Sequence, residues 1–261
     1  MRENKAKRLL QAGQPVVNGW LAIPSSLSTE IVANCDFDAA TVDLQHGLID
    51  FSHAVLMMQA LSTTTVTPIV RPTSSNAVEI MHLLDAGAYG VICPQVDDHH
   101  IAEAVVAACK YPPMGSRSFG PPRGVLYGGN DYFHFANDEI LVFVMIESKT
   151  AVANLDRILD VPGIDGVFVG PNDLSLTYGG PVGCEPGGEV GEIVEHIRAA
   201  ASSRGYFTGI YCTDGEMVNR RIKQGFQLVN PGNDSSLLKN ACNEQIAIVR
   251  SKAQSAPSAA Y

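Results

Sequence analysis

Two carboxylates stand at the ends of two apolar runs of the sequence. Glu147 directly follows Val144-Met145-Ile146, and Asp173 comes shortly after Gly166-Val167-Phe168-Val169. Carboxylates that leave adjacent buried strands side by side repel each other unless a cation lies between them. We therefore interpret Glu147 and Asp173 as ligands of a divalent metal. The alternative is that they cap the helices that follow or form salt bridges.

The type of metal follows from the ligands. A site with only two protein carboxylates suits Mg²⁺ or Mn²⁺, with Co²⁺ as a further candidate, better than a structural zinc. Hard cations keep oxygen ligands and leave coordination positions open for water and substrate. A metal held in this way can bind a 2-oxo acid through its carboxylate and keto oxygens and polarise the carbonyl group.

Other reactive side chains stand near these carboxylates in the expected fold. His46 precedes Gly47, which permits a sharp turn, so a neutral imidazole there could act as a general base; the alternative is a hydrogen-bonded structural histidine. Arg71 could clamp an oxyanion or enolate, or pair with a nearby Asp, because a buried guanidinium needs an anion. Asp85 could orient His46, or be an exposed residue at a helix end.

Several other reactive groups are excluded. Lys149 begins a helix, and no lysine ends a strand, so we expect no Schiff base. The glycine-rich segments do not fit a phosphate-binding loop, and no nucleophilic serine or cysteine arrangement is present. The remaining histidines lie in helical or loop patterns, where surface or packing roles are expected; they are His53, His82, His99, His100, His134 and His196.

The elements that must position these residues alternate along the chain. Short continuous apolar runs predict eight buried parallel strands, at 16–23, 39–44, 66–70, 90–93, 140–146, 166–169, 207–211 and 226–229. Helical spacing of apolar residues predicts helices at 28–34, 51–61, 77–86, 99–109, 151–159, 190–204, 216–224 and 235–251. Glycines at 87, 205 and 225 are expected after helices, and Asp214 and Asp234 before them.

Strict alternation of strand and helix through eight units predicts an α/β fold, a (β/α)8 TIM barrel. We expect one domain over residues 1–261, with an N-terminal helix at 1–12 and a flexible tail at 252–261. In such a barrel the active site lies at the carboxyl ends of the strands, where the carboxylates, His46 and Arg71 converge. The long irregular segment 111–137 is expected to lie over the barrel mouth.

Composition excludes several classes of partner. The net charge of −9 and the scattered Lys and Arg residues argue against nucleic acid binding. No signal peptide and no apolar window long enough for a membrane span is found. The six cysteines form no CxxC pair, so we expect reduced, buried thiols and a cytoplasmic protein.

The sequence resembles the HpcH/HpaI family of metal-dependent class II pyruvate aldolases, whose type member acts on 4-hydroxy-2-oxoheptanedioate. The resemblance covers most of residues 16–250. Its matching pieces are Asp43-Leu44-Gln45-His46, Arg71-Pro72, Leu83 to Ala88, Tyr111 to Arg117, Ile146-Glu147 and, most specifically, Leu159 to Ser175.

The resemblance implies a role for each candidate. Glu147 and Asp173 would bind the metal, Arg71 would stabilise a pyruvate enolate, and His46 with Asp85 would transfer protons. Backbone amides around Asn172 and Asp173, in the segment Gly170-Pro171-Asn172-Asp173, would receive the substrate carboxylate. It also implies a hexamer, a trimer of dimers, in which the C-terminal helix is exchanged between subunits.

The sequence departs from the family pattern around the site. The familiar Asp-Gly-Glu-His reads Asp43-Leu44-Gln45-His46, and Met145 stands where a glutamine is often found. Asp43, Gln45 and Met145 are therefore expected to surround the reactive groups and change the polarity of the pocket. Residues 118–124 also differ from the version associated with heptanedioate cleavage, so that substrate is not carried over.

The sequence predicts reversible aldol chemistry on small 2-oxo acid and aldehyde substrates. His46, directly or through a metal-bound water, would move the proton, while Arg71 and the metal stabilise the pyruvate enolate left when a 4-hydroxy-2-oxo acid is cleaved. One alternative is a related enzyme that makes this enolate from oxaloacetate by decarboxylation or uses it in condensation. A remote alternative is a non-catalytic barrel that binds an oxo acid.

Overall fold

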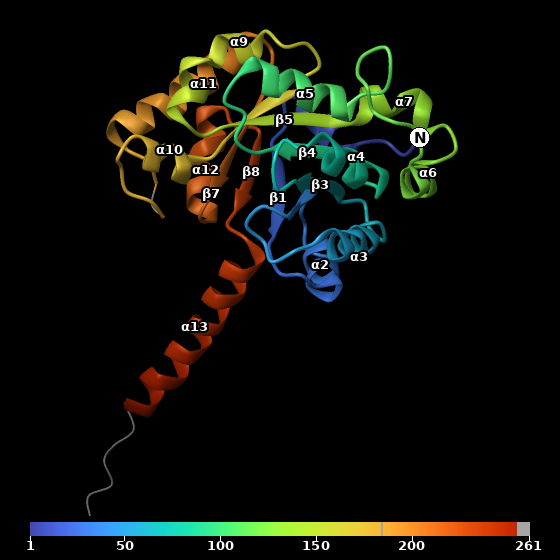
Figure 1. Ribbon diagram of the computed structural model, residues 1–261. Coiled ribbons are helices and arrows are strands. Elements are labelled where there is room, and N and C mark those ends of the chain that lie inside the picture. Colours follow the sequence, from blue (N-terminus) through green and yellow to red (C-terminus); the bar gives the residue numbers. More distant parts are fainter. Residues whose placement is uncertain (184, 255–261) are drawn as a thin grey trace, which may run out of the picture.

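The protein forms a closed barrel of eight parallel strands in sequential order, seen in a computed structural model that describes residues 1–183 and 185–254. The predicted (β/α)8 fold is therefore confirmed (Figure 1). The strands are β1 (Val16–Leu21), β2 (Ala39–Asp43), β3 (Thr67–Arg71), β4 (Gly90–Cys93), β5 (Leu141–Ile146), β6 (Gly166–Val169), β7 (Phe207–Cys212) and β8 (Leu228–Pro231).

Helices alternate with the strands, and most of them surround the barrel. They are α1 (Lys5–Gln11), α2 (Ser26–Ala33), α3 (Phe51–Leu61), α4 (Ala77–Asp85), α5 (His99–Cys109), α6 (Pro122–Gly128), α7 (Tyr132–Glu139), α8 (Lys149–Ala153), α9 (Leu155–Leu159), α10 (Pro171–Thr177), α11 (Gly188–Ser203), α12 (Gly215–Gln224) and α13 (Asp234–Gln254). None of these described helices is long and apolar enough to cross a lipid bilayer.

Most predicted helices are confirmed, with a few differences. The predicted helix 151–159 is divided into α8 and α9 at Asn154, whose backbone departs from helical geometry with φ −100° and ψ 7°. The Asn154 side chain donates a hydrogen bond to the Asp97 carbonyl. Helices α6, α7 and α10 were not predicted. Helix α6 and most of α7 lie in the segment 111–137, which was expected to be irregular. Helices α6 and α10 begin with a proline, which the first turn of a helix tolerates. The predicted glycines follow their helices with positive φ.

The barrel interior is filled by alternate residues of each strand. Its apolar core includes Ile69, Ile92, Leu141, Phe143 and Leu228, all fully buried. Parallel register aligns the strand ends, for example Asp43 beside Arg71. The packed interior therefore leaves no channel through the barrel. The last inward-facing residues of the strands form the floor of any site at their carboxyl ends.

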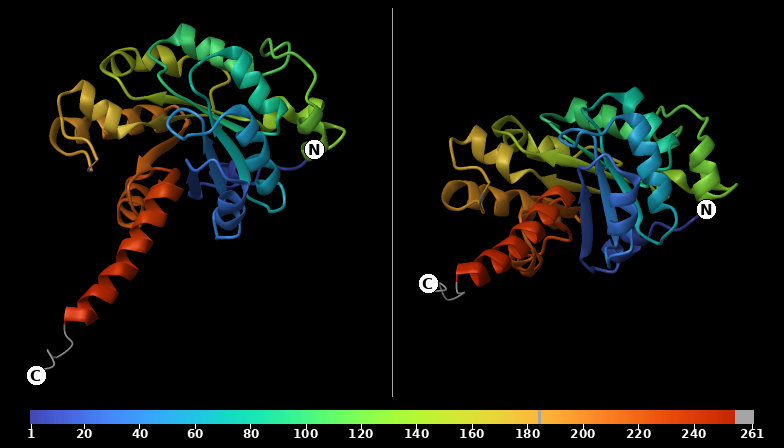
Figure 2. Two further views of the ribbon diagram at one scale, coloured as in Figure 1. Left: turned by 60° about the horizontal axis from the view of Figure 1, so that its bottom comes forward. Right: turned by 90° about the horizontal axis from the view of Figure 1, so that it is seen from below.

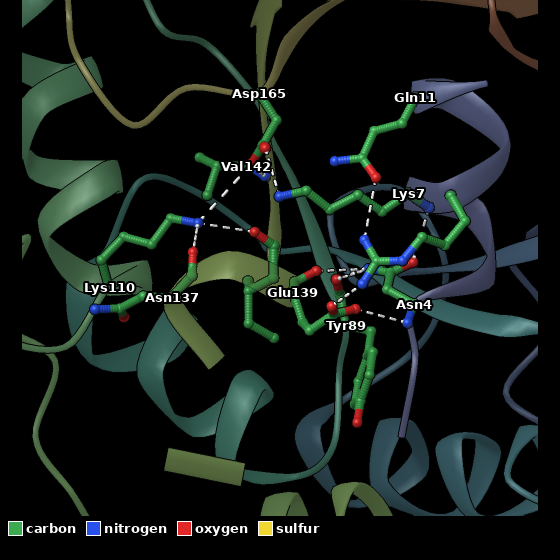
Figure 3. Close-up of polar contacts among 11 residues, drawn as sticks. Asn4, Lys7, Gln11, Tyr89, Lys110, Asn137, Glu139, Val142 and Asp165 are labelled. Carbon is green, nitrogen blue, oxygen red and sulfur yellow. Dashed lines mark hydrogen bonds and ion pairs between the residues drawn. The ribbon is translucent and has the colours of Figure 1, made fainter. Parts of the chain in front are cut away.

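A buried polar cluster closes the amino ends of the strands (Figure 3). Asn4 is fully buried, and its amide donates to the carbonyls of Tyr89 at 2.9 Å and Glu139 at 2.8 Å. Lys7 and Lys110 approach the Asp165 carboxylate from two sides, with Nζ–O distances of 2.8 and 3.9 Å. Helix α1 is thereby fixed across the end of the barrel opposite the predicted site.

The segment 111–137 lies at this same end, so the expectation that it covers the barrel mouth is wrong. It connects the end of α5 to the start of β5, and helices that return between parallel strands end beside the strand amino termini. Its contacts agree: the Arg2 amide donates to the Gly128 carbonyl, and the terminal amine pairs with Asp131. The altered residues 118–124 are therefore remote from the carboxyl ends within one chain.

Helix α13 projects away from the barrel (Figures 1 and 2). Its first residue, Asp234, accepts hydrogen bonds from the amides of Ala22 and Ile23 at 2.8 and 3.2 Å, which ties the helix to the end of β1. Asp234 was predicted to precede the helix, and Asn233 takes the capping role instead. The helix continues past its predicted end to Gln254; residues 255–261 of the predicted tail lie outside the described residues.

Replacing Asn4 by Ala is expected to lower the free energy of unfolding by about 2–3 kcal/mol. The change removes the cap of α1, where Asn4 Oδ1 accepts from the Lys7 amide at 3.0 Å, and it leaves the Glu139 carbonyl without a donor. The Tyr89 carbonyl keeps its hydrogen bond from the Leu141 amide. Urea unfolding measures the effect. Gln11→Ala is the control, because Gln11 is exposed and bonds only to the Arg8 side chain; equal losses in both variants would contradict this account.

Candidate active site

Two adjoining cavities open at the carboxyl ends of the strands. The inner cavity, of about 200 Å³, is lined by Trp20, Ala22, Asp43, His46, Arg71, Met145, Phe168, Gly170, Pro171, Asn172, Asp173, Tyr211 and Asn233. The carboxylate cavity, of about 490 Å³, is lined by Gln45, His46, Gln95, Asp97, Glu147, Ser148, Asp173, Leu176 and Thr177. His46 and Asp173 line both. A further cavity of about 400 Å³ opens near the strand amino ends, but its lining has no charged side chain.

Glu147 is buried at the end of β5, with 4% of its surface exposed. Burial raises the pKa of Glu147 to about 7; the negative charge of Asp173 adds to the rise, and the hydrogen bond from the Gln95 amide opposes it. That amide lies 2.7 Å from Oε1, and Gln95 adopts a left-handed φ of 54° to supply it. A Cβ atom on Gly170 would lie 2.3 Å from Oε2 and 3.0 Å from the Cβ of Glu147, so any larger residue would displace the Glu147 side chain.

The donor atoms around Glu147 fit a hard divalent cation. Asp173 lies in the first turn of α10, and Gln45 has its Oε1 buried without a hydrogen-bond partner in the described residues. A third carboxylate of the cavity, Asp97, accepts a hydrogen bond from Ser148 Oγ. Among residues 1–183 and 185–254 no three His, Cys, Asp or Glu side chains could hold a metal by themselves. A cation would thus combine the two carboxylates with neutral oxygens.

A buried ion pair organises the inner cavity. Arg71 Nε and Nη2 donate to the two oxygens of Asp43 at 2.8 and 2.5 Å, so the ion pair weighed as an alternative for Arg71 is present. Burial opposes ionisation of Asp43, but the hydrogen bonds and charge of Arg71 and a hydrogen bond from Trp20 hold its pKa below the usual value. The Arg71 guanidinium stacks 4.9 Å from the Trp20 ring and also lines the cavity. The Arg71 side chain is therefore held in one orientation by Asp43 and Trp20 and remains accessible to a ligand in the inner cavity.

His46 is exposed at the junction of the two cavities. The turn that carries it is held by Asp43 Oδ1, which accepts from the amides of Gln45 and His46 at 3.1 and 3.3 Å. The sharp turn predicted at Gly47 is present. The chain folds back so closely that a Cβ atom on Gly47 would lie 2.2 Å from the Asp43 carbonyl oxygen.

Asp85 is not brought to His46 within one chain. Helix α4 runs back from the carboxyl end of β3, so its last residue, Asp85, lies near the amino ends of the strands. There it accepts a hydrogen bond from the buried Arg117 at 2.8 Å. A joint role with His46 stays a prediction.

Some cavity residues were not predicted from the sequence. Met145 lines the inner cavity as expected, but Trp20, Phe168, Tyr211 and Asn233 were not singled out. These four carry no charge, so nothing in their type marks them as reactive. Their signal is positional: each lies at or near the carboxyl end of a strand, where inward-facing side chains form the floor and wall of the site.

The raised pKa of Glu147 predicts how the stability of the metal-free protein changes with pH. Between about 4.5 and 7 the unfolded chain releases a proton that the folded chain keeps, so stability falls as pH rises through this range. The wild-type protein should lose roughly 3 kcal/mol of its free energy of unfolding between pH 4 and pH 8 through Glu147, and Glu147→Gln should remove this loss. Urea unfolding in chelator at pH 4 and pH 8 measures it. Exposed Glu192→Gln is the control; a Glu147→Gln effect equal at both pH values would contradict the prediction.

The chain is similar to known aldolases over almost its whole length. Residues 19–241 match the profile described as HpcH/HpaI aldolase/citrate lyase. The hydroxypyruvate/pyruvate aldolase of Rhizorhabdus wittichii is 38% identical over 248 residues, which cover 95% of this chain and 99% of that protein. The 4-hydroxy-2-oxo-heptane-1,7-dioate aldolase of Escherichia coli is 35% identical over 242 residues, covering 92% of each.

Solved structures share the fold. A HpcH/HpaI aldolase/citrate lyase family protein from Burkholderia cenocepacia superposes with a TM-score of 0.89 at 26% identity, covering 95% of this chain and all of that one. The citrate synthase SbnG superposes with a TM-score of 0.87 at 28% identity, covering 97% and 100%. The chain therefore belongs to the HpcH/HpaI aldolase/citrate lyase family, whose aldolases are carbon–carbon lyases that generally depend on a divalent metal.

Proposed function

We propose that the protein reversibly cleaves a 4-hydroxy-2-oxo acid into pyruvate and an aldehyde at the two adjoining cavities. The observation that carries this proposal is that His46 and Asp173 line both cavities, between the buried carboxylate of Glu147 and the fixed guanidinium of Arg71. An acid-lined cavity suits a cation, and an arginine-lined cavity beside it suits an oxo acid.

Glu147 and Asp173 would hold Mg²⁺ or Mn²⁺, with the Gln45 Oε1 oxygen available in the same cavity. When bound, the metal would supply a positive charge that polarises the keto group of the substrate. Such a charge would favour the ionised form of Glu147, which burial disfavours by raising its pKa to about 7.

The remaining groups would bind the substrate and move the proton. Backbone amides around Asn172 and Asp173, in the uncapped first turn of α10 behind Gly170 and Pro171, would receive the substrate carboxylate. His46 would take the proton of the C4 hydroxyl; the C3–C4 bond then breaks, and its electron pair forms the pyruvate enolate. Arg71 would stabilise the enolate oxygen until C3 receives a proton. Within one chain Asp85 lies at the opposite end of the barrel, so the Asp85 that takes part in this proton transfer would belong to another subunit.

Replacing His46 or Arg71 should slow the exchange of the pyruvate methyl protons in D₂O with Mg²⁺ or Mn²⁺, because exchange needs the same enolate. Proton NMR should show losses of about 10²–10⁴-fold for His46→Ala and 10²–10³-fold for Arg71→Lys. Lysine keeps a positive charge opposite Asp43, so the variant is expected to stay folded.

The control is His196→Ala, because His196 is exposed on α11 and lines neither cavity. Absence of methyl deuteration in the wild-type protein with metal, or a full rate after chelation, would contradict the proposed mechanism.

An enzyme that forms the same enolate from oxaloacetate is the alternative, in keeping with the likeness to the citrate synthase SbnG at 28% identity. Both enzymes would exchange pyruvate protons. Product analysis separates them, since an aldolase releases an aldehyde from a 4-hydroxy-2-oxo acid, whereas the alternative consumes oxaloacetate faster than any such acid.

We also propose that the protein is a cytoplasmic homo-oligomer, a hexamer in which α13 is exchanged between subunits. Large apolar side chains of this helix are exposed in the single chain, with Leu238 at 58% and Val249 at 63%. Together with Ile246 they lie on one side of the helix by helical spacing. Exposed apolar stripes of this kind suit burial against another subunit. Of the cysteines expected to be buried, Cys93, Cys109 and Cys212 are buried, whereas Cys35 and Cys242 are exposed; all five are free thiols, which suit a reducing compartment.

The double variant Leu238→Glu, Val249→Glu should dissociate the oligomer, because burying two carboxylates in an apolar interface is unfavourable. Sedimentation velocity should shift the protein toward the 27.8 kDa monomer. Asn240→Glu places the same charge on the opposite side of α13 by helical spacing and should leave the wild-type mass unchanged. A monomeric wild-type protein would overturn the proposal.

A further inference from the structure

The inner cavity has a polar wall that the proposed reaction does not use. Tyr211 at the end of β7 and Asn233 just before α13 both line it. The metal ligands, the base and the arginine clamp belong to other strands, β2, β3, β5 and the β6–α10 turn. A phenol and an amide placed together in a catalytic cavity suggest recognition of a part of the substrate remote from the reacting carboxylate.

The hydroxyl of Tyr211 is held by its neighbours. Asn233 Nδ2 donates to the Tyr211 hydroxyl oxygen at 3.3 Å, so the oxygen is used as an acceptor. The phenol proton has no acceptor among the described residues, and so it is free to donate into the cavity. Burial raises the pKa of Tyr211, which keeps this proton in place at neutral pH.

The orientation of the Asn233 amide is fixed from the other side. Its Oδ1 accepts hydrogen bonds from Ser235 Oγ and the Ser236 amide, both at 2.8 Å. These contacts cap α13 and leave only Nδ2 to face Tyr211. The pair is thus a directed arrangement, in which the amide donates to the phenol and the phenol can donate to a ligand.

The Trp20 ring packs against both Tyr211 and the arginine clamp. The Trp20 ring lies 5.3 Å from the Tyr211 ring, edge to face, and 4.9 Å from the Arg71 guanidinium. Apolar side chains, among them Met145 and Phe168, make up other parts of the wall. A ligand whose oxo acid lies at Arg71 can therefore meet a neutral donor at Tyr211.

We propose that Tyr211, positioned by Asn233, forms an acceptor subsite that selects aldehydes with an oxygen on the carbon next to the carbonyl group. This subsite rests on the proposed aldolase function. The Tyr211 hydroxyl donates a hydrogen bond to that oxygen, and the small size of the inner cavity, about 200 Å³, restricts the subsite to short aldehydes. A deoxy aldehyde of equal size leaves the donor unpaired and is disfavoured.

Glycolaldehyde and propanal test the subsite, because they have equal numbers of heavy atoms and differ in one oxygen. Condensation of each with pyruvate gives a ratio of kcat/KM values for wild type and Tyr211→Phe. The ratio should favour glycolaldehyde in wild type and fall about three- to tenfold in the variant, the value of one neutral hydrogen bond. Because a ratio is compared, a general loss of activity or of folded protein cancels.

Asn233→Asp provides an independent variant. Its carboxylate can still cap α13, but it accepts the Tyr211 proton and withdraws the donor from the cavity. The ratio should fall as in Tyr211→Phe, and the double variant should show no further fall. Tyr178→Phe, which makes the same chemical change at the end of α10 outside both cavities, should leave the ratio unchanged.

The outcomes separate the two proposals. Wild-type protein that exchanges pyruvate protons while Tyr211→Phe keeps the wild-type aldehyde ratio would overturn the subsite and leave the aldolase function in place. Wild-type protein without exchange would contradict the aldolase function itself. A ratio that changes equally in Tyr178→Phe would also overturn the role of the Tyr211 hydroxyl.

Discussion

The buried carboxylate of Glu147 is the constraint on which the site depends. Its charge is opposed by burial and by Asp173, which together raise its pKa to about 7. Two neighbouring residues accommodate the buried carboxylate. Gln95, in a left-handed conformation, donates its backbone amide to it, and Gly170 has no side chain that would displace it. One backbone amide is little compensation for a buried charge. A divalent cation shared by Glu147 and Asp173 is the simplest group that would supply the rest.

The second buried charge, on Arg71, is balanced by another side chain of the protein. Asp43 neutralises it fully within the chain, with two hydrogen bonds, and also holds the turn that carries His46. The guanidinium is thus fixed before any substrate binds, so little reorganisation is needed when an oxyanion forms. The charge of Arg71 is balanced by the polypeptide itself, whereas the charges of Glu147 and Asp173 would be balanced by a bound metal. His46 and Asp173 lie where the two cavities meet.

Much of the fold and the charged part of the site could be predicted, because apolar runs mark the strands and the carboxyl-end rule then brings Glu147, Asp173, His46 and Arg71 together. The same rule of direction explains the errors. Asp85 is the last residue of a helix that runs antiparallel to the strands, and the segment 111–137 follows another such helix, so both lie at the opposite end. The left-handed turn and the uncharged cavity wall could not be predicted, since they depend on backbone conformation and on side-chain contacts across the barrel.

The central claim is that Glu147 and Asp173 share a divalent metal beside an oxo acid held by Arg71. A crystal structure of the protein grown with Mn²⁺ and pyruvate, with anomalous scattering recorded for manganese, tests it most directly. The account predicts an anomalous peak within bonding distance of both carboxylates, with pyruvate in the inner cavity next to Arg71. A peak at another place, or pyruvate bound without manganese at Glu147 and Asp173, would contradict it.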